Sequence, residues 1–245
     1  MNYSRTGETN DPEQSILHTW QLNALPWTRA VRGGSIESRR LVTDQAIIAA
    51  IMAREPSSVI DVGCGEGWLL RALADSGAGG GGSSGLRLTG FDAIAALIDA
   101  AKHAGRKDAG RADYHVASYE DLAAGRMAIA GDAVVCNFSL LGREPVEALI
   151  RAMPSMLTPR GVFIVQTLHP MVACGPSTYE DGWRATTWDG CGDHFTDPAP
   201  WYFRTLGSWL ELLRGAGLRL LELQEPLHPH TGKPASVILV AEAMR

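Results

Sequence analysis

The sequence predicts an α/β protein with a doubly wound, mostly parallel sheet of seven strands and helices on both faces. Two observations support this prediction. Strand-like and helix-like patterns alternate from residue 58 to residue 167, and two more strand patterns, at 218–223 and 236–242, close the chain. Right-handed crossovers then place the C-terminal ends of the parallel strands along one edge of the sheet, where such folds bind ligands.

The stretch 58–73 predicts a buried strand, a glycine-rich turn and a helix. The β-branched run is Val59, Ile60 and Val62, and the turn glycines are Gly63, Gly65 and Gly67. Backbone N–H groups at the start of a helix favour an anionic or strongly polar ligand. Trp68 stands where a dinucleotide fingerprint has its third glycine, and the chain has no Walker-type phosphate loop.

The N-terminal residues 1–34 predict a lid or cap, in which an apolar helical pattern from Ser15 to Ala30 is broken or kinked at Pro26. A second helix is expected over 35–55, before Pro56. Three arginines lie near its start: Arg32, Arg39 and Arg40. Two interpretations are open: they form a solvated basic face, or one of them binds a carboxylate through its planar set of donors.

Patterns along the rest of the chain complete the predicted sheet. Further strands are expected at 86–91, 114–117, 132–137 and 162–167, and helices at 93–104, 118–122, 145–156 and 206–216. Regular periodicity stops from residue 169 to residue 202, a segment that contains Trp183, Trp188, Trp201 and Tyr202. A loop of this length in a compact domain is usually functional or disordered, and its aromatic content favours function.

Composition excludes several classes of function. The chain has 245 residues and a net charge of −5, which argues against broad contact with nucleic acid. It has no apolar run long enough to span a membrane and no N-terminal signal pattern, so a cytoplasmic location is expected. Its four cysteines lack C-x-x-C spacing, and His228 and His230 without a third ligand are weak evidence for a metal, so neither a disulfide framework nor a metal site is predicted.

The string Asp61-Val62-Gly63-Cys64-Gly65-Glu66-Gly67 closely resembles the first motif of the class I S-adenosylmethionine-dependent methyltransferases. The turn 157–161, Leu-Thr-Pro-Arg-Gly, has the form Leu-x-Pro-x-Gly and precedes an apolar strand, as in that family. Residues 35–245 resemble its small-molecule branch, which includes ubiquinone-pathway methyltransferases. The resemblance implies a Rossmann-like fold with an antiparallel last strand, one domain over 35–245 with an insertion at 169–202, and S-adenosylmethionine as the cofactor.

Most residues of the predicted cofactor site are chosen because they lie at the C-terminal ends of expected strands or because this resemblance implies them. Asp92, at the tip of the second strand, is expected to accept hydrogen bonds from ribose hydroxyls; the alternative is an acid that serves only a helix N-terminus. Ser118 stands where the family commonly has an acid for the adenine, so Tyr119 is expected to contribute packing. The complete predicted set is Asp61, Gly63, Cys64, Gly65, Gly67, Asp92, Ser118, Tyr119, Asn137, Phe138 and Arg40.

The acceptor side is predicted from His169 and from aromatic residues. His169 follows the fifth strand and is a candidate general base, with a hydrogen-bonded structural histidine as the equal alternative. Trp27, Arg32, Trp201 and Tyr202 are expected to contact a small, apolar or aromatic acceptor, methylated on oxygen or nitrogen. Alternatively, the tryptophans form only a satellite core under a long loop.

Other functions are open on the sequence alone. A nicotinamide oxidoreductase would use a similar sheet and acid, although Trp68 argues against it. A non-catalytic regulator would keep the glycine loop without an acceptor site, and an RNA or protein acceptor is the alternative among methyltransferases. The sequence predicts no oligomeric state.

Overall fold

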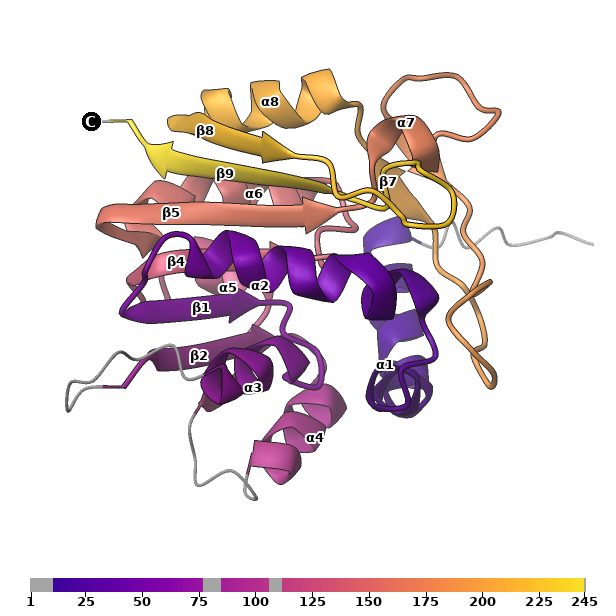
Figure 1. Cartoon of the computed structure of the whole chain (residues 1–245), viewed down its shortest axis with the longest axis horizontal. Coiled ribbons are helices and arrows are strands. Elements are labelled where there is room, and N and C mark those ends of the chain that lie inside the picture. Colours follow the sequence, from indigo (N-terminus) through magenta and orange to yellow (C-terminus); the bar gives the residue numbers. More distant parts are fainter. Residues whose placement is uncertain (1–10, 77–84, 106–111, 245) are drawn as a thin grey trace, which may run out of the picture.

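The computed structural model describes residues 11–76, 85–105 and 112–244, so residues 1–10 of the predicted cap lie outside it. Its main sheet has seven strands in the order β3-β2-β1-β4-β5-β9-β8 (Figure 1). The strands are β1 (Ser58–Val62), β2 (Arg87–Asp92), β3 (Asp113–Val116), β4 (Gly131–Asn137), β5 (Leu157–Thr167), β8 (Leu218–Gln224) and β9 (Val237–Ala243). Strands β1 to β5 run parallel and β9 is antiparallel to both its neighbours, which confirms the predicted fold class.

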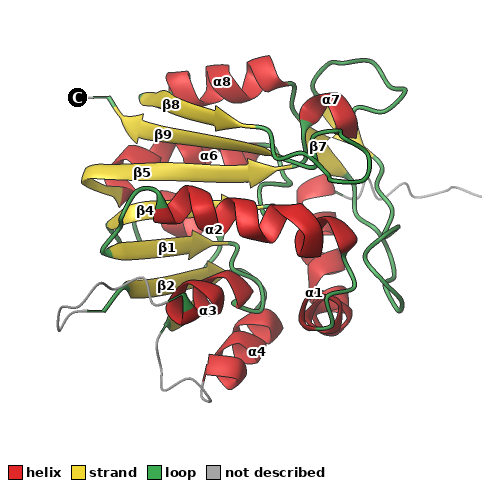
Figure 2. Cartoon of the chain, in the orientation of Figure 1, coloured by secondary structure: helices red, strands yellow, loops and turns green. Residues whose placement is uncertain are grey.

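Helices cover both faces of this sheet (Figure 2). One face packs against α2 (Asp44–Met52) and α3 (Trp68–Asp75), and the other against α6 (Glu144–Ala152) and α8 (Leu206–Gly215). All five residues of β1 are buried, because a central parallel strand has no solvent face. Further helical elements along the sheet are α4 (Ala95–Gly105), α5 (Tyr119–Ala123) and the 3₁₀ turn η3 (Met153–Met156).

The N-terminal helix α1 (Pro12–Arg32) runs through Pro26 without interruption, so of the predicted break or kink the break is wrong. Asp11 caps the helix by accepting from the Glu13 N–H at 3.1 Å. Proline removes one backbone donor, and packing on either side of it offsets that loss: Ala24 is buried against α4, with Trp27 packed beside it. This helix therefore forms one continuous element beside the C-terminal ends of the parallel strands (Figure 1).

The helix predicted over 35–55 is shorter and irregular. It contains a π-helical turn, η1 (Arg39–Thr43), before α2, and Met52 is its last residue. The wider turn buries Arg39, whose guanidinium bonds to Asp44 at the start of α2. Such π-turns are rare and often occur at functional sites.

The segment 169–202, predicted to lack regular structure, contains short elements. These are α7 (Pro170–Ala173) and β6 (Gly182–Arg184), which pairs antiparallel with β7 (Trp201–Phe203). In the described part of the chain, no helix is both long and apolar enough to cross a membrane.

Candidate active site

The glycine loop between β1 and α3 has two glycines enclosed by side chains and one with room beside it. All three have left-handed backbones, with φ of 76°, 56° and 80° at Gly63, Gly65 and Gly67. A Cβ on Gly63 would lie 2.3 Å from the Ser139 Cβ, and one on Gly67 would lie 2.7 Å from the Tyr114 ring. On Gly65 the nearest atom would be 3.5 Å away, an ordinary contact. Packing therefore requires glycine at the outer two positions, whereas Gly65 leaves space for a ligand.

Cys64 holds this loop against the core. The backbone N–H groups of Gly63 and Cys64 both donate to the Phe91 carbonyl, at 2.7 and 2.9 Å. Its thiol is buried, and burial, with the nearby charge of Asp61, raises the pKa of Cys64 well above its ordinary value. The thiol stays protonated and acts as a small apolar group.

Asp92 lies at the tip of β2, against the glycine loop. Its Oδ2 accepts from the Gly65 N–H at 2.9 Å, and its Oδ1 accepts from the Ile94 N–H at 2.8 Å. Burial raises the pKa of Asp92, and these two backbone hydrogen bonds partly offset the rise. The carboxylate thus orients the loop, and each oxygen keeps a lone pair for a further donor such as a hydroxyl.

A row of buried acceptor atoms without partners among the described residues lies along the ends of β1, β4 and β5. The atoms are Asp61 Oδ1, Asn137 Oδ1 and Gln166 Oε1. Asp61 pairs with Val135, two residues before Asn137, and Asn137 pairs with Gln166. Paired residues in neighbouring strands share a face, so these three side chains lie on one face, the one that α2 and α3 cover. Buried acceptors are costly to leave unpaired, so the row marks a place for a donor.

Asp61 is the most perturbed acid in this row. Burial, followed by the charge of Asp92, raises the pKa of Asp61 from 3.8 to about 8. A neutral Asp61 is therefore the main form of the folded protein at pH 7. A bound cation would favour the ionised form instead.

Arg39, rather than Arg40, is the buried arginine beside the glycine loop. Its guanidinium donates to both carboxylate oxygens of Asp44, at 2.9 and 3.2 Å, and lies 4.5 Å from the Trp68 ring centre. Its Nη1 is buried without a partner in the described residues. Arg40 is exposed. The predicted carboxylate contact at Arg40 is untested, but the geometry favours its neighbour.

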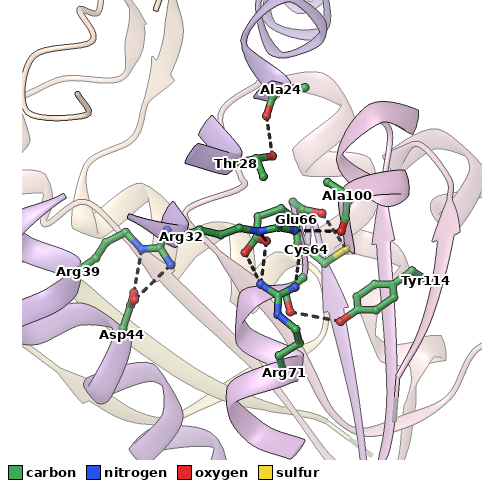
Figure 3. A network of polar contacts seen from close by, with 12 residues as sticks. Ala24, Thr28, Arg32, Arg39, Asp44, Cys64, Glu66, Arg71, Ala100 and Tyr114 are labelled. Carbon is green, nitrogen blue, oxygen red and sulfur yellow. Dashed lines mark hydrogen bonds and ion pairs between the residues drawn. The ribbon is translucent and has the colours of Figure 1, made fainter. Parts of the chain in front are cut away.

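Arg32, itself exposed, belongs to a cluster of charges around the buried Glu66 that joins α1 to the glycine loop (Figure 3). Glu66 has no exposed surface, and its Oε2 accepts from Arg32 Nε at 2.7 Å while its Oε1 accepts from Arg71 Nη2 at 2.7 Å. Arg32 also donates to the Ala100 carbonyl, in the middle of α4, at 3.0 Å. Two of its donor groups are thus engaged within the protein, so it orients the cap helix in this structure.

Ser118 and Tyr119 have local structural partners. The Ser118 hydroxyl accepts from the Asp121 N–H at 3.2 Å, and the Asp121 carboxylate accepts from the Ser118 N–H at 3.1 Å, which makes a capping box for α5. The Tyr119 hydroxyl donates to the Ser139 carbonyl at 2.8 Å, and burial raises its pKa well above the ordinary value. Tyr119 therefore ties the ends of β3 and β4 together beneath the loop.

Phe138 follows β4 in a strained conformation. Its φ of 53° is uncommon for a residue with a Cβ, and its N–H donates to the Gln166 carbonyl of β5 at 2.8 Å. Strain of this kind gathers at ligand sites, where the surrounding structure stabilises it.

His169 lies three residues beyond Gln166 and is 5% exposed. Its Nε2 is 2.7 Å from Oε1 of Glu225, which follows β8. Its Nδ1 is buried and has no partner in the described part of the chain. The histidine is thus held at one ring nitrogen and unpaired at the other.

The aromatic residues form two separate clusters. Trp27 packs edge-on to Trp20 at 5.1 Å, and Trp20 packs on Trp188 of the insertion at 5.6 Å. The Trp27 indole nitrogen is the atom nearest to a Cβ built on Gly65, which places this residue beside the loop. Trp201 and Tyr202 lie in β7, where Tyr202 packs beneath Arg204 at 4.7 Å. The predicted acceptor contacts of these residues remain predictions.

A buried asparagine holds the insertion on α1. The Asn23 side chain donates to the Thr196 carbonyl at 2.8 Å and accepts from the Thr196 N–H at 2.9 Å. Thr19 adds a bond from its hydroxyl to the Asp197 carbonyl at 2.7 Å. Helix α1 and the insertion are therefore held together by hydrogen bonds.

Comparison with known proteins assigns this arrangement to a class. The fold is shared with an S-adenosylmethionine-dependent methyltransferase from Mesorhizobium loti (TM-score 0.56, 19% identity, 79% of this chain and 95% of that one). It is also shared with the 1,6-didemethyltoxoflavin-N1-methyltransferase of Burkholderia thailandensis, whose structure holds 1,6-didemethyltoxoflavin and S-adenosylhomocysteine (TM-score 0.67, 15% identity, 100% and 99% covered). Fold, glycine loop and strand-end acid define a class I S-adenosylmethionine-dependent methyltransferase.

A family model described as a methyltransferase domain matches residues 38–223, and the chain belongs to that family. Among curated proteins, the ubiquinone biosynthesis O-methyltransferase of Xanthomonas campestris pv. campestris is 35% identical over 122 residues, which are 50% of this chain and 47% of that protein. A protein of the same description from Xylella fastidiosa is 33% identical over 115 residues, 47% of this chain and 43% of that protein. The matched part is thus less than half the length of these relatives.

Proposed function

We propose that this chain is an enzyme that transfers the methyl group of S-adenosylmethionine to the oxygen, or less favourably the nitrogen, of a small apolar or aromatic acceptor. The row of unpaired acceptors carries the proposal, since it suits an occupant with donor groups, and the open Gly65 leaves room for one. The name of the 35% identical relatives supports an oxygen, and the 1,6-didemethyltoxoflavin bound to the Burkholderia enzyme supports a small-molecule acceptor.

The unpaired atoms suit both charged ends of the cofactor's amino-acid part. An ammonium group donates hydrogen bonds, which Asp61 and Asn137 are able to accept. A carboxylate accepts them, which suits the unpaired Nη1 of Arg39. Asp92 is assigned to the ribose hydroxyls, and Gly65 to the close approach of backbone and ligand. Trp27 and Arg39 are assigned as further neighbours of the cofactor.

When bound, this cofactor supplies a methyl group already activated on a positively charged sulfur. The protein's tasks are then to orient the acceptor, to exclude water and to receive a proton where the acceptor has to lose one. Helix α1 and the insertion, which are hydrogen-bonded to each other, are suited to exclude water. His169, at the end of β5, is assigned to the third.

Asp92→Ala tests the cofactor site. Loss of a carboxylate that accepts two hydrogen bonds should weaken binding of S-adenosylhomocysteine by about 2 kcal/mol, on the order of thirtyfold, measured by calorimetry. Asp99→Ala, on the exposed side of α4, is the matched control and should leave the affinity unchanged. Equal affinities in both variants would reject the assignment of Asp92.

A methyl-transfer screen over phenols, catechols, enols, heteroaromatic amines, short RNAs and peptides tests the acceptor. Turnover of a small ring compound is expected. Preference for RNA or peptide would refute the small acceptor, and cofactor binding without any turnover would favour a regulator. Binding of NADH in place of S-adenosylhomocysteine would favour an oxidoreductase.

A further inference from the structure

The contact between His169 and Glu225 joins two strand ends that are not neighbours in the sheet. His169 follows β5 and Glu225 follows β8, and β9 runs between those strands. Glu225 is followed by a hairpin that fixes its backbone, in which the Ala235 N–H donates to the Pro226 carbonyl at 2.8 Å. The bond from the ring to this carboxylate therefore depends on folding of the whole C-terminal part of the sheet.

The carboxylate decides which ring nitrogen carries the proton. An ionised carboxylate only accepts hydrogen bonds, so the Nε2 at 2.7 Å has to be the protonated nitrogen. In the neutral ring, Nδ1 then carries the lone pair. The Glu225 side chain is half exposed, so water solvates its charge, whereas the ring is almost fully buried. The arrangement thus presents a buried nitrogen acceptor with no partner among the described residues.

The backbone that leads to His169 is joined to the end of β4. Gln166, three residues before His169, accepts the Phe138 N–H at the strained end of β4. Its side chain donates to Ser236 at 2.9 Å, which joins β5 to the start of β9. The backbone that carries His169 is therefore held on both sides, and a fixed ring is what a proton acceptor needs.

We propose that Glu225 is a positioning residue for the methyl transfer: it holds His169 in the Nε2–H tautomer, so that Nδ1 receives the proton of the acceptor hydroxyl. This rests on the proposed function. The acceptor oxygen forms its bond to the methyl carbon and gives its proton to Nδ1. The carbon–sulfur bond breaks with its electron pair on sulfur, and the proton on the imidazolium then leaves to water.

Glu225→Ala removes the carboxylate at a half-exposed position, so the protein should stay folded. Glu222→Ala is the matched control: it removes a glutamate three residues earlier, with a side chain of similar exposure that pairs with Arg54 instead. Nitrogen-15 NMR of labelled histidine reports the tautomer without any acceptor, and His169→Asn identifies the signal. We expect a single Nε2–H tautomer in the wild type and in Glu222→Ala, and a mixture of tautomers in Glu225→Ala.

Kinetics with an acceptor found in the screen form the second readout. Glu225→Ala should lower kcat by about tenfold or more, with the affinity for S-adenosylhomocysteine unchanged, and Glu222→Ala should change neither. An Nδ1–H tautomer in the wild type, the same tautomer in both variants, or an unchanged kcat in Glu225→Ala would overturn the inference. If no acceptor is methylated, the proposed function fails while the NMR result still decides the role of Glu225 toward His169.

Discussion

The two sides of the ligand edge differ in whether their polar side chains have hydrogen-bond partners. Around the glycine loop, Asp92 and Glu66 are bonded to backbone N–H groups or to arginines. Along the ends of β1, β4 and β5, the buried oxygens of Asp61, Asn137 and Gln166 have no partner in the described structure. The first side is therefore preformed, whereas the second stays unsatisfied until a ligand supplies donors. Unsatisfied buried groups lower stability, so they indicate where function has been favoured over folding.

Among tests of this contrast, the largest change in the free energy of unfolding is expected for Asp61→Asn. Asp61 keeps its proton up to about pH 8 in the folded state, whereas an unfolded aspartate ionises near pH 4. In that window the folded state binds more protons, so the free energy of unfolding of the wild type falls as pH rises from about 4 to about 8. The variant escapes this loss, which at pH 7 is on the order of 4 kcal/mol.

Thermal or urea unfolding across this pH range measures the gain. The advantage of Asp61→Asn should vanish near pH 4 and grow toward pH 8, while cofactor affinity falls. Equal pH dependence in both proteins would show that Asp61 is not held neutral, and the contrast between the two sides would weaken.

A loss of about 3 kcal/mol is expected on the preformed side for Glu66→Ala, because two arginines next to a buried position lose their counter-charge. Glu242→Ala, which breaks an exposed pair with Arg219, is the control and should change stability by only a few tenths of a kcal/mol. Urea unfolding of both variants gives the comparison. Similar values would mean that the cluster joining α1 to the loop contributes little.

Alanine substitutions in the glycine loop should change stability by up to about 2 kcal/mol. They distinguish a glycine needed for packing from one needed for cofactor binding. Gly63→Ala places a Cβ against Ser139 and should destabilise the fold by about that amount. Gly65→Ala meets no close atom, so only its left-handed backbone is strained, by about 1 kcal/mol, while cofactor affinity falls by about tenfold or more. Unfolding and calorimetry on the pair test this. Normal affinity in a folded Gly65→Ala would show that the loop does not hold the cofactor.

The smallest expected effect distinguishes Arg39 from Arg40. Arg39→Lys should weaken cofactor binding by about tenfold, since an ammonium group cannot hold Asp44 by two bonds and a ligand carboxylate as well. Arg40→Lys should leave affinity unchanged. If calorimetry shows the reverse order, the contact belongs to Arg40, as the sequence predicted.

The sheet was predictable because its order follows from few rules. Alternating strands and helices with right-handed crossovers bring the C-terminal ends of β1, β2, β4 and β5 to one edge, and the glycine motif and Asp92 mark that edge. Elements governed by packing were not predictable. Pro26 indicates a break in isolation, yet the contacts of Ala24 and Trp27 keep α1 whole.

Contacts between distant segments account for the rest of the site. Arg39 and Arg40 are adjacent and chemically equal, and no local pattern indicates that Arg39 of the π-turn is the buried one. Glu225 meets His169 through the register of β8 and β9, which no local pattern specifies. Glu66 stands inside the recognised motif, but its partners come from α1 and α3.

The helix α1 lies outside residues 38–223, the part of the chain that the family model matches. It nevertheless carries Arg32 to the glycine loop, places Trp27 beside Gly65, and holds the insertion through Asn23. The N-terminal limit of the family match is thus not a structural boundary, because α1 contacts residues on the other side of it. Exchange of insertions between relatives, as a means to change what is methylated, would therefore require each insertion to travel together with the N-terminal helix that matches it.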